Sequence, residues 1–197
     1  MAKRTLPDFA QTVSVVDQFL KEFQAETDRG TVLIAGAYLD DLLASLLRAF
    51  FVDDPKIVNG LITIDGPLGT FATRIDLTYC LGLIRSDQHE DFHTCRKIRN
   101  LCAHSHKRIS FDEQPIIDLC RNLKQIQIIE QLRDQMSPAE QELLIDRFKT
   151  NRQTFVGNIV HLAMGLMVRG VQLKHRIVGK GFEEDSNVKL PFESNGV

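Results

Sequence analysis

The chain has 197 residues, of which 43% are hydrophobic and 25% are charged, a composition typical of a soluble globular protein. This length fits one domain of ordinary size or two very small ones, and a chain this long can bury a core without disulfides or metal ions. The 24 basic and 26 acidic residues give a net charge of −2, which argues against a protein that coats nucleic acid through overall positive charge.

Targeting signals are not evident. The first residues are basic but no apolar segment follows them, so they do not form a secretory signal. The longest uncharged run, residues 153–168, includes Gln153, Asn158 and His161, and we interpret it as a buried helix rather than a membrane span. The chain has four cysteines and no CxxC pair, which predicts small core residues in a reduced cytoplasm: Cys80, Cys95, Cys102 and Cys120. We expect a cytoplasmic protein with no membrane contact.

Helical periodicity runs through most of the chain and predicts six to seven helices. The first covers residues 6–23 and the second residues 31–51. A short helix follows Asp53-Asp54-Pro55, because Asp caps a helix and Pro fits its first turn. Further helices are expected at residues 71–84, from Ser86 or Asp87 to 104, and at 112–135. Ser137-Pro138-Ala139-Glu140 begins the last, which could extend to residue 177, with Gly157, Gly165 or Gly170 as possible bends.

Two segments are predicted to be non-helical. Gly66-Pro67-Leu68-Gly69 has the composition of a tight turn, which would position the following helix, and it lacks the Gly-Lys-Ser/Thr ending of a phosphate loop. From residue 179 the tail is polar and contains glycine, so residues 179–197 are expected to be disordered. The expected architecture is therefore an all-α single-domain helical bundle over residues 1–178, without strand pairs.

Charge is concentrated in one place. Residues 96–108 contain five basic side chains and no acidic one, so the rest of the chain has a formal charge of −7 (19 basic minus 26 acidic residues). Besides Arg99, the segment has four candidate binding residues: Arg96, Lys97, Lys107 and Arg108. Any contact with nucleic acid is expected at this segment, since the remaining surface repels phosphate.

A helical wheel of this segment separates a core side from a polar side. At about 100° per residue, Cys95, Ile98 and Cys102 face the core. The opposite side is continuous and has the small Ala103 near its middle; it consists of Arg96, Arg99, Asn100, Ala103 and His104. An Arg can hold phosphate oxygens bidentately and a His can transfer a proton near neutral pH, so the face could cleave RNA without metal. The alternative is an ordinary solvated helix face.

The segment Arg99-Asn100-Leu101-Cys102-Ala103-His104 resembles the Arg-x4–6-His motif of the HEPN superfamily. This resemblance implies a helical bundle that dimerises with the two motifs facing each other. It also implies metal-independent endoribonuclease activity, often of toxins or defence proteins. Arg99 and His104 would then be catalytic and Asn100 would assist, although some members of the superfamily have lost catalysis.

A second resemblance covers more of the chain, about residues 28–135. Asp65-Gly66-Pro67-Leu68-Gly69 and residues 74–84 resemble the mannitol operon repressor family, MtlR and its YggD-like relatives. Residues 37–43 and 109–113 also fit that family. The resemblance implies a transcriptional regulator, since members of this family are described as regulators and most of them repress sugar-alcohol uptake. The sequence has no helix-turn-helix with a basic recognition helix, which argues against direct DNA binding and favours a protein or RNA partner.

His89-Glu90-Asp91-Phe92-His93 matches the zinc-protease pattern HExxH. Asp91 is atypical of that pattern, and the sequence indicates no third ligand, since Glu113 lies beyond the expected loop. We therefore interpret these residues as solvated first turns of a helix and predict no metal site and no cofactor. Cys102 points to the core, which argues against metal binding with His104 and His106. Either Asp40 or Asp41 is expected to form an ion pair with a basic residue of another helix.

Taken together, the sequence predicts a cytoplasmic homodimer with a regulatory function, acting through a protein or RNA partner. The alternative is a HEPN-type endoribonuclease. The apolar stripe Phe155, Ile159, Leu162 and Leu166 of the last helix is expected to pack centrally or at the dimer interface.

Overall fold

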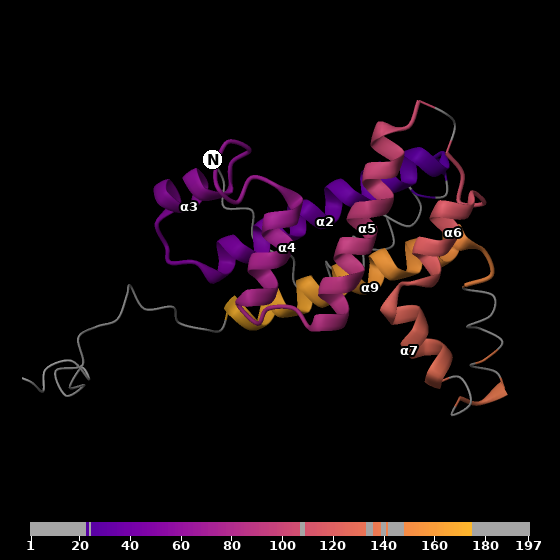
Figure 1. Cartoon of the computed structure of the whole chain (residues 1–197). Helices are drawn as coiled ribbons and strands as arrows, with labels where there is room; N and C mark the ends of the chain where they lie inside the picture. The colour runs from indigo at the N-terminus through magenta and orange to yellow at the C-terminus, as the bar shows by residue number, and fades with distance from the viewer. Residues whose placement is uncertain are drawn as a thin grey trace, which may run out of the picture.

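The computed structural model describes residues 23, 25–106, 109–132, 136–138, 141 and 148–174. Helices account for the regular structure within these residues, and no strand occurs among them. The helices are α2 (Asp28–Phe50), α3 (Pro55–Ile62), α4 (Phe71–Cys80), α5 (Ser86–His104), α6 (Gln114–Arg121), α7 (Lys124–Leu132) and α9 (Asn151–Lys174) (Figure 1). The predicted all-α class is confirmed.

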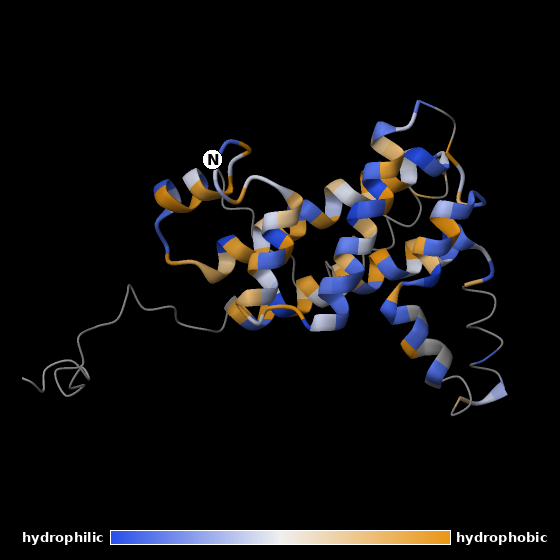
Figure 2. Ribbon diagram, in the orientation of Figure 1, coloured by the Kyte–Doolittle hydropathy of each residue, from blue (hydrophilic) through white to orange (hydrophobic). Residues whose placement is uncertain are grey.

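Helix α2 lies at the centre of the bundle and packs against α9, α5 and α4. Its leucines Leu39, Leu43 and Leu46 are fully buried. The predicted stripe on the last helix is buried as well and therefore packs centrally: Phe155, Ile159, Leu162 and Leu166. Figure 2 shows hydrophilic and hydrophobic residues alternating along α5, as one-sided burial requires.

Within the part of the chain that the structure describes, two helices are long and apolar enough to cross a membrane, namely Asp28–Phe50 and Asn151–Leu173. Their most apolar windows are 56% and 50% buried inside the protein. These are the two helices that pack against each other in the core. Their apolar character is thus explained by burial within the bundle.

The helix start expected at Pro55 is confirmed, whereas α5 begins at Ser86 with Arg85 as its N-cap rather than the expected Ser86 or Asp87. The Asp54 carboxylate accepts hydrogen bonds from the N–H groups of Lys56 and Ile57, both at 3.2 Å, and caps α3. Helix α4 begins at Phe71, where the Thr70 hydroxyl accepts from the N–H of Thr73. At one end of the bundle lie α3 and the loop after it, and at the other end lie α6 and α7 (Figure 1).

The prediction of a single helix at residues 112–135 is wrong. The chain forms α6 and then α7, with a break at Asn122 and Leu123. Asp91 on α5 explains the break, because its carboxylate accepts hydrogen bonds from the N–H groups of Lys124 (2.6 Å) and Gln125 (3.1 Å). A side chain distant in sequence therefore caps α7. Asp91 is buried rather than solvated, which corrects the sequence-based interpretation.

The long last helix is also shorter than predicted. A turn at residues 148–150 precedes α9, and Thr150 and Gln153 exchange hydrogen bonds there. This reciprocal pair is a capping box, which begins a new helix at Asn151. The candidate bend positions Gly157, Gly165 and Gly170 all lie inside α9.

Three of the four cysteines are buried as predicted: Cys95, Cys102 and Cys120. Burial raises the pKa of the Cys102 thiol to about 11 and that of Cys120 to about 12, so both stay protonated at neutral pH. Cys80 is exposed at the end of α4, which corrects its assignment to the core. The helix predicted at residues 6–23 (except Phe23), the tail 179–197, Lys107 and Arg108 lie outside the described residues.

Candidate functional sites on helix α5

The C-terminal half of α5 presents the polar face that the helical wheel predicts. Cys95, Ile98 and Cys102 are buried on one side. Arg99, Ala103 and His104 are exposed on the other, and Asn100 is half-buried. The Arg99 guanidinium donates a hydrogen bond to the side-chain oxygen of Asn100 at 3.1 Å. Among the described residues, no hydrogen bond joins Arg99 to His104.

Gly36 of α2 allows Arg99 to cross the face of that helix. A Cβ atom at Gly36 would lie 2.8 Å from Cγ of Arg99, which is too close for an ordinary contact. The positive charge of the Arg99 guanidinium is also near enough to Asp40 to favour the ionised form of the Asp40 carboxyl group. Burial nevertheless raises the pKa of Asp40, while the hydrogen bond from Arg74 and, less strongly, the charge of Arg99 oppose that rise. The α5 face is thus supported from beneath by α2.

The other basic candidates differ in accessibility. Lys97 is exposed and Arg96 is half-buried. The Nε atom of Arg96 is buried and has no hydrogen-bond partner among the described residues. Lys107 and Arg108 are not among the described residues, so the structure brings together only the first part of the predicted basic segment.

Arg74 connects the glycine-rich turn to the core. It forms an ion pair of 2.6 Å with Asp40, as expected for one member of the Asp40-Asp41 pair. It also donates to the carbonyl oxygens of Leu68 and Ile62, both at 2.8 Å. The buried guanidinium therefore holds the end of α3 and the turn against α2. The predicted tight turn before α4 is confirmed.

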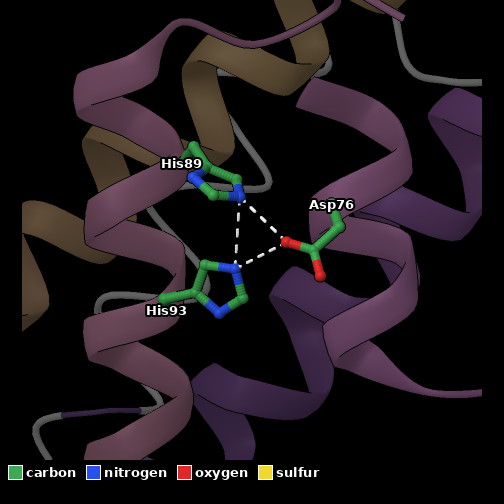
Figure 3. A group of neighbouring side chains, drawn as sticks. All are labelled: Asp76, His89 and His93. Carbon is green, nitrogen blue, oxygen red and sulfur yellow. Dashed lines mark hydrogen bonds and ion pairs between the residues drawn. The ribbon is translucent and has the colours of Figure 1, made fainter. Parts of the chain in front are cut away.

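A second polar cluster lies at the N-terminal half of α5, where it faces α4 (Figure 3). The Nε2 atoms of His89 and His93 lie 2.9 and 2.8 Å from Oδ1 of Asp76, and 3.2 Å from each other. Both imidazoles are about a quarter exposed, whereas the Asp76 side chain is 57% exposed. Hydrogen bonds from His89 and His93 lower the pKa of Asp76.

Asp76 is a member of this cluster that no sequence pattern indicates. His89 and His93 are one turn apart on the same helix, which the HExxH spacing indicates, but Asp76 belongs to α4 and only the helix packing brings it to them. The ring of Tyr79, also on α4, stacks on His89 with centroids 4.5 Å apart. Glu90 instead forms an ion pair of 3.4 Å with Lys124 on α7. The glutamate of the HExxH pattern is therefore engaged elsewhere.

Comparisons with known proteins place this arrangement in a wider context. A sequence model of the mannitol repressor family, MtlR, matches residues 15–172. The fold is similar to that of MtlR from Escherichia coli, solved in a complex with HPr, with a TM-score of 0.60 and 24% identity over 78% of this chain and 99% of that chain. It is also similar to YggD from Shigella flexneri, described as a possible transcriptional regulator, with a TM-score of 0.54 and 18% identity over 80% of this chain and 98% of that chain. No curated protein matches the chain significantly.

Proposed function

Because this chain belongs to the mannitol repressor family, we propose that it is a cytoplasmic transcriptional regulator that acts by binding a protein partner rather than by reading DNA. The observation that carries the proposal is the similarity in fold to an MtlR protein that was solved with a protein partner, HPr. HPr is accordingly the first candidate partner for this chain. Within the described residues, no helix-turn-helix with a basic recognition helix supports operator reading.

We assign the partner-binding surface to the polar face of α5. Arg99 is exposed on this face and Lys97 is exposed at its edge, next to His104 on the helical wheel. The small Ala103 leaves the face open between Arg99 and His104. Charged side chains on such a face determine partner choice and the association rate more than the total affinity. The remainder of the chain is acidic, so the face would also orient an approaching acidic partner.

Charge reversal tests this surface. In a calorimetric titration with HPr from the same organism, we expect Lys97→Glu to weaken binding about tenfold, which corresponds to about 1.4 kcal/mol. Lys56→Glu, which reverses an exposed lysine on α3, is the matched control and should bind as the wild type does. Equal affinities of the two variants would contradict the assignment of the surface.

A homodimer is part of the proposal. The apolar stripe of α9 is used inside the protomer, so any dimer must use another surface. Light scattering coupled to gel filtration should give about twice the chain mass of 22.4 kDa. A monomer mass across the concentration range would contradict the dimer without affecting the partner proposal.

The second candidate function is metal-independent RNA cleavage by Arg99 and His104, with Asn100 assisting. The observation in its favour is that Arg99 and His104 are both exposed on one side of α5. Labelled RNA incubated with the purified protein in EDTA separates the two functions. If the protein is purely regulatory, the RNA should remain intact. Cleavage by the wild type that disappears in His104→Ala would overturn a purely regulatory function.

A further inference from the structure

We propose that Asp76, His89 and His93 form a binding site for a divalent transition-metal ion, zinc in particular. The three side chains come from two helices, α4 and α5, and point one ligand atom each toward a common centre (Figure 3). This inference does not depend on the regulatory function proposed above. It departs from the sequence-based prediction of no metal, which rested on the lack of a third ligand.

The spacing of the ligand atoms fits a tetrahedral ion. Zinc bound at about 2.0–2.1 Å places neighbouring tetrahedral ligands about 3.3 Å apart. The three observed separations are 2.8, 2.9 and 3.2 Å. Movements of a few tenths of an ångström in side chains that are partly exposed would therefore form three bonds to zinc.

The chemistry of the donors selects the class of metal. Two imidazole nitrogens and one carboxylate oxygen suit zinc, cobalt, nickel or copper, whereas magnesium and calcium prefer oxygen donors alone. The exposure of Asp76 provides a route of entry from solvent. With three protein ligands, the fourth position of the ion would hold water or a group from a partner.

The rings are already held in place without an ion. The stacked Tyr79 ring supports His89, and the rings of His89 and His93 meet edge to face with centroids 4.6 Å apart. Such prior orientation reduces the conformational entropy lost on binding. When both imidazoles donate their Nε2–H groups to Oδ1 of Asp76, neither Nε2 atom is free to accept, so the 3.2 Å contact between them cannot also be a hydrogen bond.

The contacts around the cluster indicate a structural metal site rather than the active site of a protease. Glu90, the potential general base of an HExxH enzyme, is paired with Lys124 instead. A bound ion would join α4, which follows the glycine-rich turn, to α5, which carries the polar face. Metal binding would therefore stabilise the folded protein through mass action.

The test is zinc binding by the full chain after removal of any polyhistidine tag and of bound metal with EDTA. Elemental analysis after equilibration with zinc should give one ion per chain for the wild type. His93→Ala should bind at least about 100-fold more weakly, because even the outer partners of metal ligands contribute about 10- to 100-fold. His106→Ala removes an exposed histidine outside the cluster and should bind as the wild type does.

A second measurement does not require a folded variant. Cobalt added to the metal-free wild type should produce the visible absorption of a four-coordinate ion, and zinc should abolish it. Absence of stoichiometric zinc together with no such cobalt spectrum would overturn the site and leave a hydrogen-bonded His–Asp cluster. Equal zinc affinity of His93→Ala and the wild type would overturn it as well.

Discussion

At the scale of single residues, the side chains of the α5 face are positioned by their own helix, whereas Asp76 reaches His89 and His93 through the packing of α4 on α5. The helical wheel depends only on local geometry, so it correctly separates Cys95 and Ile98 from Arg99. The approach of Asp76 to His89 depends on how α4 packs on α5, and no local pattern contains that information. The burial of Asp91 was missed for the same reason, because its partners lie on α7.

His161 on α9 makes the free energy of unfolding depend on pH. Its Nε2 atom is buried without a hydrogen-bond partner among the described residues. Burial, with a smaller contribution from the charge of Arg85, lowers the pKa of His161 below its ordinary value of 6.5. The unfolded chain therefore takes up this proton first as the pH falls. Stability should decrease as the pH drops below about 6.5 and continue to decrease down to the folded-state pKa.

Urea unfolding across this pH range measures the effect. His161→Leu removes the titrating group, so the pH dependence should be weaker than in the wild type. His106→Ala, which changes an exposed histidine, should keep the wild-type slope. An unchanged slope in His161→Leu would show that other groups cause the pH dependence.

At the scale of helices and loops, the start of α3 could be predicted because its signals are local. Pro55 and the acidic cap before it are adjacent in sequence. The capping box at Thr150 and Gln153 is also local, so the sequence contains the signal for the start of α9. The break between α6 and α7 has no glycine or proline, and its cap comes from α5, so it could not be predicted from the local sequence.

The turn before α4 requires glycine for a steric reason. A Cβ atom at Gly66 would lie 2.4 Å from the carbonyl oxygens of Gly60 and Leu61. These are backbone atoms, so Gly66→Ala requires the turn to move, at an expected cost of about 1–3 kcal/mol in the free energy of unfolding. Loss of the turn would also disturb the hydrogen bond from Arg74 to Leu68.

Gly60 provides the matched control. It lies in α3, and a Cβ atom there would meet nothing within 4 Å. Gly60→Ala should therefore raise the free energy of unfolding by about 0.5–1 kcal/mol. Chemical denaturation of both variants measures the contrast, and a Gly66→Ala variant as stable as Gly60→Ala would contradict the steric account.

At the scale of the whole molecule, the near-neutral total charge conceals an acidic protein with one basic segment. Residues outside 96–108 have a formal charge of −7, and the exposed basic side chains described within that segment lie on one helix. Two long apolar helices, α2 and α9, form the core that supports this helix. The fold class followed from helical periodicity, because that pattern is repeated along the chain. The identity of the partner does not follow from periodicity, because it depends on the shape of a surface.

The most direct test of the regulatory account is a calorimetric titration of the wild-type protein with HPr from the same organism. We expect saturable binding with a defined stoichiometry, and we expect high salt to weaken it because exposed charges contribute to the interface. No detectable binding at concentrations that suffice for a weak complex would contradict the proposal that HPr is the partner through which this protein acts.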